Sequence, residues 1–169
     1  MGLPSKLKNL NVFEDGASYL GQIAEFTLPK LSRQMEDWRG GGMNGPVKSD
    51  HGMQAIEAEW TAGGLILNTI RKFGAATVDA VQLRFCAAYQ NDENGAVDAV
   101  EIVLRGRHEE IDMGNGKPGD NTEHKIKTAC AYYKLIVNGV TEIEIDLLNM
   151  VEIVGGVDRL AAQRAAIGV

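Results

Sequence analysis

The sequence lacks the features of several common classes of protein. It has only two cysteines in 169 residues, Cys86 and Cys130, which are too few for a disulfide framework. No apolar run approaches the roughly 20 residues that a membrane-spanning helix needs, and the first residues lack the long apolar stretch of a secretory signal. We therefore expect a protein of the cytosol with reduced thiols that does not bind a membrane by itself.

Basic residues are outnumbered by acidic ones. The chain has 17 Lys and Arg against 23 Asp and Glu, a formal net charge of -6. Residues 1–50 are neutral, so the whole excess lies in residues 51–169. A protein that holds nucleic acid through its phosphates needs a basic face. The charge balance therefore argues against such binding and favours a surface that repels polyanions.

Residue patterns of enzymes and metal sites are missing as well. The three histidines, His51, His108 and His124, are scattered, and none has a cysteine or carboxylate at the spacing of a zinc site. The glycines at 40–42 are not followed by the Gly-Lys-Ser/Thr of a phosphate-binding loop. The acidic cluster at 109–112 is interpreted as a solvated strand end, because solvent would equalise its carboxyl groups. The sequence predicts no catalytic residue, no metal and no cofactor.

What is present is an alternation of apolar and polar residues, which is typical of half-buried strands. It occurs at 53–62, 81–86 and 97–107, so we expect a mainly β fold of antiparallel sandwich or barrel-like form. The apolar positions of the first and third runs are predicted to face the core: Ile56, Ala58, Trp60, Val100, Ile102 and Leu104. In the second run, Val81, Leu83 and Phe85 alternate with Gln82, Arg84 and Cys86.

Local signals place one hairpin and one helix. Asn138-Gly139 is the preferred dipeptide of a two-residue type I′ turn, which would pair Val137 with Val140 and Leu135 with Glu142. Apolar residues at helical spacing predict a short helix at 65–73, which Gly74 would end. A helical turn is also expected near 157–163.

Two glycine-rich segments, 38–52 and 112–122, break the alternation and are predicted to be long loops. Long loops on a small β scaffold are usually functional or mobile. Trp38 opens the first loop and is a candidate interface anchor, whereas Trp60 lies on the apolar face of its strand.

The strand-like runs 18–37 and 97–111 exceed the typical five or six residues of a strand. At about 3.3 Å per residue, a 14-residue strand reaches roughly 46 Å, which is longer than a compact domain of this size is wide. Such strands leave open edges, and Pro29 is the only proline that could block pairing with a neighbour. The sequence therefore favours an assembly built through its sheets.

The chain resembles a known family, the major tail tube proteins of contractile-tailed phages of the P2 type. The resemblance runs in order from Lys6 to Val169. It is carried by LPKL at 28–31, RGGGMNG at 39–45, RGRHEEIDMGNGKPGD at 105–120, and EIDLLNM, GGVDRL and IG across 144–168. Tube proteins of R-type bacteriocins are similar, and the secreted tube protein of type VI systems is more distantly so.

The resemblance implies a single tail tube domain over 1–169 with an N-terminal arm at 1–12. Six subunits would form a ring, and stacked rings would form the inner tube of a virion tail. Four long strands of each subunit would join one ring-wide β-barrel, with the helix and the Asn138-Gly139 hairpin outside it. We assign these strands to 18–36, 52–62, 97–111 and 122–137.

The resemblance also implies functional residues. With the alternation, it suggests a lumen face formed by Glu25, Glu57, Glu59, Glu101 and Lys127. The loop expected to reach the adjacent ring contains Trp38, Arg39, Gly40, Gly41, Gly42, Met43 and Asn44.

The implied partners are further copies of the chain, the tail sheath protein, baseplate or tail-tip proteins, the tail terminator and a tape measure protein in the lumen. DNA would pass through the tube without specific binding, and assembly would take place in the cytoplasm of the bacterial host. The alternatives are a bacteriocin tube that carries no DNA and a monomeric β-barrel binding module. An enzymatic function is the weakest hypothesis, because no set of residues meets the geometric requirements of an active site.

Overall fold

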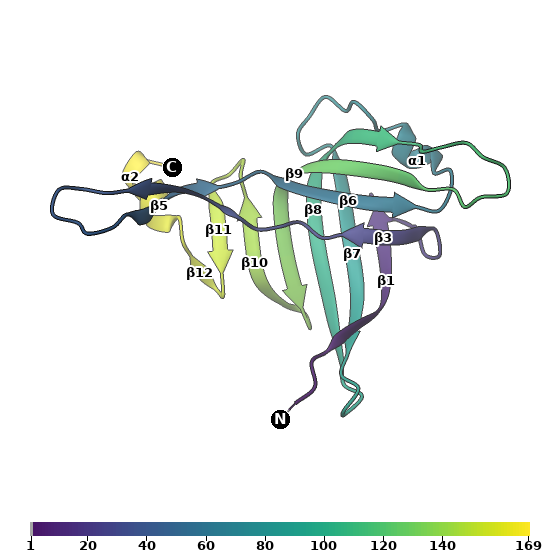
Figure 1. Ribbon diagram of the computed structural model, residues 1–169, viewed down its shortest axis with the longest axis horizontal. Coiled ribbons are helices and arrows are strands. Elements are labelled where there is room, and N and C mark those ends of the chain that lie inside the picture. The colour runs from purple at the N-terminus through teal and green to yellow at the C-terminus, as the bar shows by residue number, and fades with distance from the viewer. Residues whose placement is uncertain (1) are drawn as a thin grey trace.

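The computed structural model describes residues 2–169 (Figure 1). Strands make up 53% of the chain and helices 7%, and all strand pairs are antiparallel. The predicted mainly β, sandwich-like class is therefore confirmed, although the sheet of a single subunit does not close into a barrel.

In chain order the elements are β1 (Lys6–Glu14), β2 (Ala17–Ser18), β3 (Ile23–Thr27), β4 (Arg33–Trp38), β5 (Val47–Met53), β6 (Ile56–Ala62), α1 (Leu67–Ile70), β7 (Val81–Gln90), β8 (Val97–Asp112), β9 (His124–Val137), β10 (Val140–Asp146), β11 (Val151–Val154), β12 (Val157–Asp158) and α2 (Ala161–Ile167).

Ten of the strands form one sheet that divides at β9. The first half of β9 pairs with β6, and the second half pairs with β10. A front sheet thus contains β3, β6 and the adjacent halves of β9 and β8, whereas the rear sheet runs from β12 through β10, the other halves of β9 and β8, and β7 to β1 and β2. The strands of the two sheets cross in Figure 1.

Gly106 marks the point where β8 passes from the rear sheet to the front sheet. The register of β8 against β9 shifts between Arg105 and Gly106, and the pairing of β8 with β7 ends at Gly106. A Cβ at this position would lie 2.1 Å from the carbonyl oxygen of Ala129. Only glycine lets the two backbones approach this closely.

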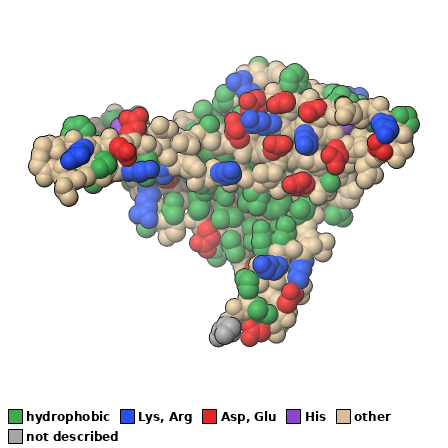
Figure 2. Space-filling view, in the orientation of Figure 1, with side chains coloured by type: hydrophobic (Ala, Val, Ile, Leu, Met, Phe, Trp, Pro, Cys, Tyr) green, Lys and Arg blue, Asp and Glu red, His purple; other side chains and the backbone are tan. Residues whose placement is uncertain are grey.

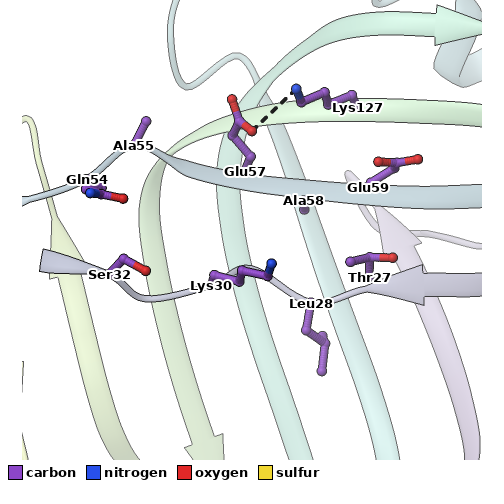
Figure 3. A pocket seen from close by; sticks show the side chains of 10 residues that line it. All are labelled: Thr27, Leu28, Lys30, Ser32, Gln54, Ala55, Glu57, Ala58, Glu59 and Lys127. Carbon is purple, nitrogen blue, oxygen red and sulfur yellow. Dashed lines mark ion pairs between the residues drawn. The ribbon is translucent and has the colours of Figure 1, made fainter.

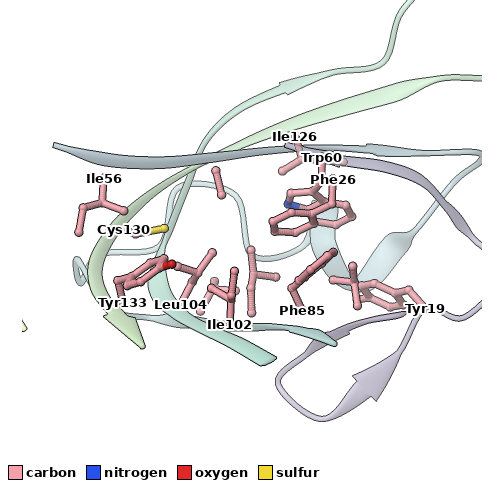
Figure 4. Packing of buried hydrophobic residues seen from close by; sticks show 14 of the residues in the cluster. Tyr19, Phe26, Ile56, Trp60, Phe85, Ile102, Leu104, Ile126, Cys130 and Tyr133 are labelled. Atoms are coloured by element: carbon pink, nitrogen blue, oxygen red, sulfur yellow. The ribbon is translucent and has the colours of Figure 1, made fainter. Parts of the chain in front are cut away.

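The core lies between the two sheets (Figure 4). Phe26 of the front sheet packs on Phe85 of the rear sheet, with ring centroids 5.1 Å apart. Trp60 stacks with Tyr19 at 6.2 Å. The predicted core positions Ile56, Ala58, Trp60, Ile102 and Leu104 are buried, and Val100 is half-buried at the margin of the core. Val81, Leu83 and Phe85 of β7 are buried as well.

The predicted turn is confirmed, because Asn138 and Gly139 both have positive φ, 49° and 79°, and Val137 pairs with Val140. The pairing of Leu135 with Glu142 is wrong. A bulge between Thr141 and Ile143 places Ile143 opposite Leu135, because the bulge adds one residue to β10.

Other boundaries also differ from expectation. The predicted helix at 65–73 is a shorter α1 followed by turns. The helical turn expected near 157–163 is confirmed in part, because α2 begins at Ala161, but residues 157–158 form β12. Most of the predicted arm, 1–12, belongs to β1, which pairs with β7; Met1 lies outside the described residues.

The long run 18–36 is not one strand. It is divided among the end of β2, β3 and the start of β4, and Pro29 lies in the interruption at 28–32, where a residue without an N–H cannot continue a ladder. The loop predicted at 38–52 is shorter than expected, because Val47–Met53 forms β5 and pairs with β4. Residues 113–123 contain no strand, in agreement with the loop predicted at 112–122.

Candidate functional site: a charged sheet with open edges and a projecting hairpin

The outward face of the front sheet is charged (Figure 2). Glu57 and Glu59 alternate along β6 with buried residues, so both project away from the core. Glu59 lies opposite Lys127 of β9 in the register. Lys127 Nζ also forms an ion pair with Glu57 Oε2 at 3.4 Å (Figure 3), and Glu25 is exposed on the neighbouring β3. Four of the five predicted lumen residues therefore share one face.

Carboxylates outnumber basic side chains on this face. Nearby Glu109 raises the pKa of Lys127 above its ordinary value, and a hydrogen bond to Glu57 adds to the effect. Lys127 is thus held as a cation among acidic neighbours. Against three basic residues, Arg107, Lys125 and Lys127, the front sheet carries six acidic ones: Glu25, Glu57, Glu59, Glu109, Glu110 and Asp112.

The structure does not bring Glu101 to this face. Glu101 belongs to the rear-sheet half of β8, opposite Ile136 of β9, and forms an ion pair with Arg84 of β7 at 2.7 Å. Its neighbours Val100 and Ile102 face the core, so Glu101 points to the outer face of the rear sheet. The alternation along β8 correctly predicted that Glu101 points away from the core. The bend of β8 at Gly106, however, places Glu101 on the rear sheet, apart from the face that carries Glu57.

The front sheet has two open edges within the described chain. β3 pairs with β6 alone, and β8 beyond Gly106 pairs with β9 alone. No proline lies within either edge segment, 23–27 or 107–112. Unpaired N–H and C=O groups on such edges are a template for another strand.

The hairpin β4–β5 projects from the sandwich along the direction of the front strands (Figure 1). A hydrogen bond of 2.9 Å from Gln54 N to Ser32 O continues the ladder between this hairpin and β3–β6. Arg33 holds its base, with Nε 2.8 Å from Asp50 Oδ2 and Nη1 2.6 Å from Glu152 Oε1 of β11.

The tip of the hairpin contains all seven residues predicted to reach an adjacent ring. Trp38 ends β4 with 62% of its surface exposed. The turn is closed by a hydrogen bond from Met43 N to Gly40 O at 3.2 Å and by one from Arg39 Nε to Met43 O at 3.2 Å. The tip thus presents an aromatic side chain from an ordered turn.

A buried polar cluster, which the sequence did not predict, fastens the layers behind this face. His108 contacts Thr128 Oγ1 through Nδ1 and Glu14 Oε1 through Nε2, both at 3.0 Å. Tyr19 and Thr69 donate hydrogen bonds to Glu14 Oε2. The hydroxyl–imidazole–carboxylate order is similar to that of a hydrolase, but Glu14, His108 and Thr128 are at most 3% exposed, so no substrate reaches them.

The cluster strongly perturbs Glu14. Burial alone would raise its pKa, but hydrogen bonds from His108, Thr69 and Tyr19 outweigh burial and lower the pKa to about 2. Lys72 of the segment after α1 adds an ion pair, with Nζ 3.5 Å from Glu14 Oε1. Glu14 is therefore ionised and structural at neutral pH.

Within residues 2–169, no group of three or more His, Cys, Asp or Glu side chains could hold a metal ion. The described helices include none that is long and apolar enough to cross a membrane.

The fold is that of the tube components of contractile injection systems. The chain is similar to the sheath/tube terminator of the extracellular contractile injection system PVC, with a TM-score of 0.57 and 11% identity over 77% of this chain and 93% of that one. It is also similar to the tube-terminating cap of the anti-feeding prophage, with a TM-score of 0.56 and 10% identity over 75% of this chain and 87% of that one.

Sequence comparison defines the family. The family described as "Phage tail tube protein FII" matches residues 4–168. The tail tube protein of Escherichia phage P2 is 48% identical over 171 residues, covering 99% of both chains. The major tail tube protein of Serratia phage KSP20 is 39% identical over 153 residues, covering 89% of this chain and 88% of that one. The chain belongs to the phage tail tube protein family, whose members are structural components of the virion tail rather than enzymes.

Proposed function

We propose that six copies of this chain join edge to edge into a ring, and that stacked rings form the inner tube of a contractile phage tail through which DNA is ejected. The observation that carries this proposal is the front sheet, which has an apolar inner side, a charged outer side and two unpaired edges. Copies related by rotation can cover these edges without any change of fold.

The directions of the two edges support such closure. Neighbouring strands of the front sheet are antiparallel in the order β8, β9, β6 and β3, so β3 and β8 run in opposite directions. Rotation about a tube axis that lies roughly along the strands leaves these directions unchanged. β3 of one copy beside β8 of the next therefore continues the antiparallel pattern, and a closed ring has no open edge.

The charged face lines the channel in this arrangement. Four strands from each of six copies, spaced about 4.8 Å apart, give a circumference of about 115 Å and a backbone diameter of about 37 Å. Because carboxylates outnumber basic groups on the face, the channel repels phosphate and lets DNA slide. Glu25, Glu57, Glu59 and Lys127 belong to this lining, whereas Glu101 lies outside it.

The hairpin β4–β5 supplies the contact between rings. It projects in the direction of the strands, and hence along the tube axis, beyond the front sheet (Figure 1). The exposed Trp38 at its tip is the kind of side chain that anchors interfaces. Residues 38–44 are therefore assigned to the contact with the adjacent ring.

The remaining partners follow from the role of the tube. The similarity to a terminator, a cap and a sheath–tube complex of injection systems supports contacts with sheath, terminator and baseplate proteins. A tape measure protein would occupy the lumen during assembly in the host cytoplasm. An R-type bacteriocin tube would use the same geometry, but the full-length similarity to phage proteins favours the phage tail.

Intersubunit disulfide formation between the two edges tests the proposal. In a Cys86→Ser background, Glu25→Cys in β3 is combined with single cysteines at each position from 107 to 112 in β8. We expect at least one pair to give a ladder of covalent oligomers ending at six. The matched control combines Glu25→Cys with Glu57→Cys, which is on an interior strand and should give no ladder. If every combination of Glu25→Cys with a cysteine at 107 to 112 gave monomers alone, the proposal would be contradicted.

A further inference from the structure

Part of the apolar inner face of the rear sheet is left uncovered by the front sheet. In Figure 2, hydrophobic side chains gather below the charged band of the front sheet, over the rear strands that extend past β3. Figure 3 shows Leu28, just after β3, pointing over the same strands. The half-buried members of the core on this margin, here called the overhang patch, are Leu10, Leu28, Tyr89, Val100, Leu135 and Ile143.

The overhang patch is a continuation of the core rather than a separate surface feature. Val100 occupies the core-facing side of β8, two residues before the buried Ile102. Leu135 lies opposite both Ile102 and Ile143 in the register. A row of core-facing positions therefore runs on beyond the last strand of the front sheet, where it meets solvent in the isolated subunit. Contiguous exposed apolar area of this kind marks an interaction surface.

The dimensions of the layers indicate what covers the patch. The four front strands are about 19 Å wide at about 4.8 Å per strand, whereas β7 with its ten residues is about 33 Å long. In a ring of six, an outer layer about 10 Å farther from the axis needs an arc of about 30 Å per copy against about 19 Å for the inner layer. The length by which the rear sheet extends past the front sheet is thus close to the difference in arc length between the outer and inner layers of a closed ring.

We propose that the overhang patch is covered by the front sheet of the neighbouring copy, whose β8 edge segment, 107–112, lies across it beside β3. This inference rests on the proposed ring and names the surface that completes the core. The patch borders the open edge of β3, so the same copy that pairs with β3 must continue over it. Ile111, the half-buried apolar residue of the incoming segment, lies within this contact. Each subunit therefore has a complete hydrophobic core only when a neighbour is bound.

Thiol reactivity in subunits and tubes tests this assignment. Val100→Cys and Ala99→Cys are made separately in a Cys86→Ser background, so that adjacent positions of β8 report on the inner and outer faces. Cys130 can remain, because burial raises its pKa to about 12 and keeps it unreactive. On assembly, we expect modification of Val100→Cys to slow at least tenfold and that of Ala99→Cys to change less than threefold.

Electron microscopy of the same samples shows whether rings and tubes have formed. Tubes in which Val100→Cys reacts as fast as in the free subunit would overturn the assignment of the patch and leave the proposed tube intact. Protection of Val100→Cys that requires an added partner protein would likewise overturn it, because the covering surface would not be a second copy. A failure to form rings at any concentration would contradict the proposed function itself.

Discussion

His108 Nε2 lies 3.0 Å from Glu14 Oε1, although the two residues are 94 positions apart and both are fully buried. The contact joins β1 of the rear sheet to the front-sheet half of β8. Thr69 of α1 donates a hydrogen bond to the same Glu14 carboxylate. Removal of one partner from a buried charged network leaves the other uncompensated, which costs several kcal/mol. The cluster therefore fixes how the two sheets lie relative to each other.

Acid should weaken the fold through Glu14. Its pKa of about 2 in the folded protein lies below the ordinary value of 4.5, so its contribution is complete above about pH 5 and is lost as the pH falls toward 2. The contribution is on the order of 3 kcal/mol. Urea unfolding from pH 6 to pH 3 should show a loss of about 2 kcal/mol of this contribution for the natural chain. Glu14→Gln should be less stable at pH 6 and less dependent on pH. Glu109→Gln, an exposed control, should keep the natural profile.

The bend in β8 should depend on Gly106. A methyl group there would lie 2.1 Å from the backbone of Ala129, so Gly106→Ala should lower the free energy of unfolding by about 3 kcal/mol or more. Gly116→Ala is the matched control, because nothing lies within 4 Å of its Cβ position. Equal stability of the two variants would show that β8 does not need this close approach.

Arg33 should control the order of the hairpin rather than global stability. Its ion pairs with Asp50 and Glu152 are partly exposed, and such pairs contribute about 1 kcal/mol or less. We expect Arg33→Ala to accelerate hydrogen exchange in β4 and β5 while β7 and β8 keep their protection. Lys117→Ala, which removes the exposed pair with Asp120, should leave exchange in the hairpin unchanged.

Trp38 should matter for assembly and not for the subunit. Because its side chain is 62% exposed, Trp38→Ala should change the free energy of unfolding by less than about 0.5 kcal/mol. The concentration needed for tube formation should rise at least tenfold, as for the loss of an interface anchor. Trp38→Phe should recover most of the assembly. Unchanged assembly of Trp38→Ala, measured by sedimentation, would remove Trp38 from the contact between rings.

The sequence predicts local features well and distant pairings poorly. Alternation placed Ile56, Trp60, Ile102 and Leu104 in the core because a period of two is set by the backbone itself. The Asn138-Gly139 turn was predictable because positive φ selects those residues. In contrast, the break at 28–32 was missed although Pro29 lies within it, because its extent also depends on how β3 and β4 meet different partners, β6 and β5.

In the candidate site, too, local features were predictable and contacts between distant segments were not. Polar positions of single strands were identified correctly, but the separation of Glu101 from Glu57 depends on the bend at Gly106, which no pattern within one strand reveals. The cluster of Glu14 and His108 was missed because its members come from β1, β8, β9 and α1. The one hint in the sequence was Glu14, a charged residue that directly follows the apolar Val12 and Phe13.

The most direct measurement is a cryo-electron microscopy map of the protein assembled from the purified chain. We expect stacked rings of six subunits in which β3 of each copy pairs with β8 of the next, with Glu57 and Glu59 facing an open channel. A map in which these two glutamates face away from the channel, or in which each front sheet ends at its own edges, would contradict this expectation.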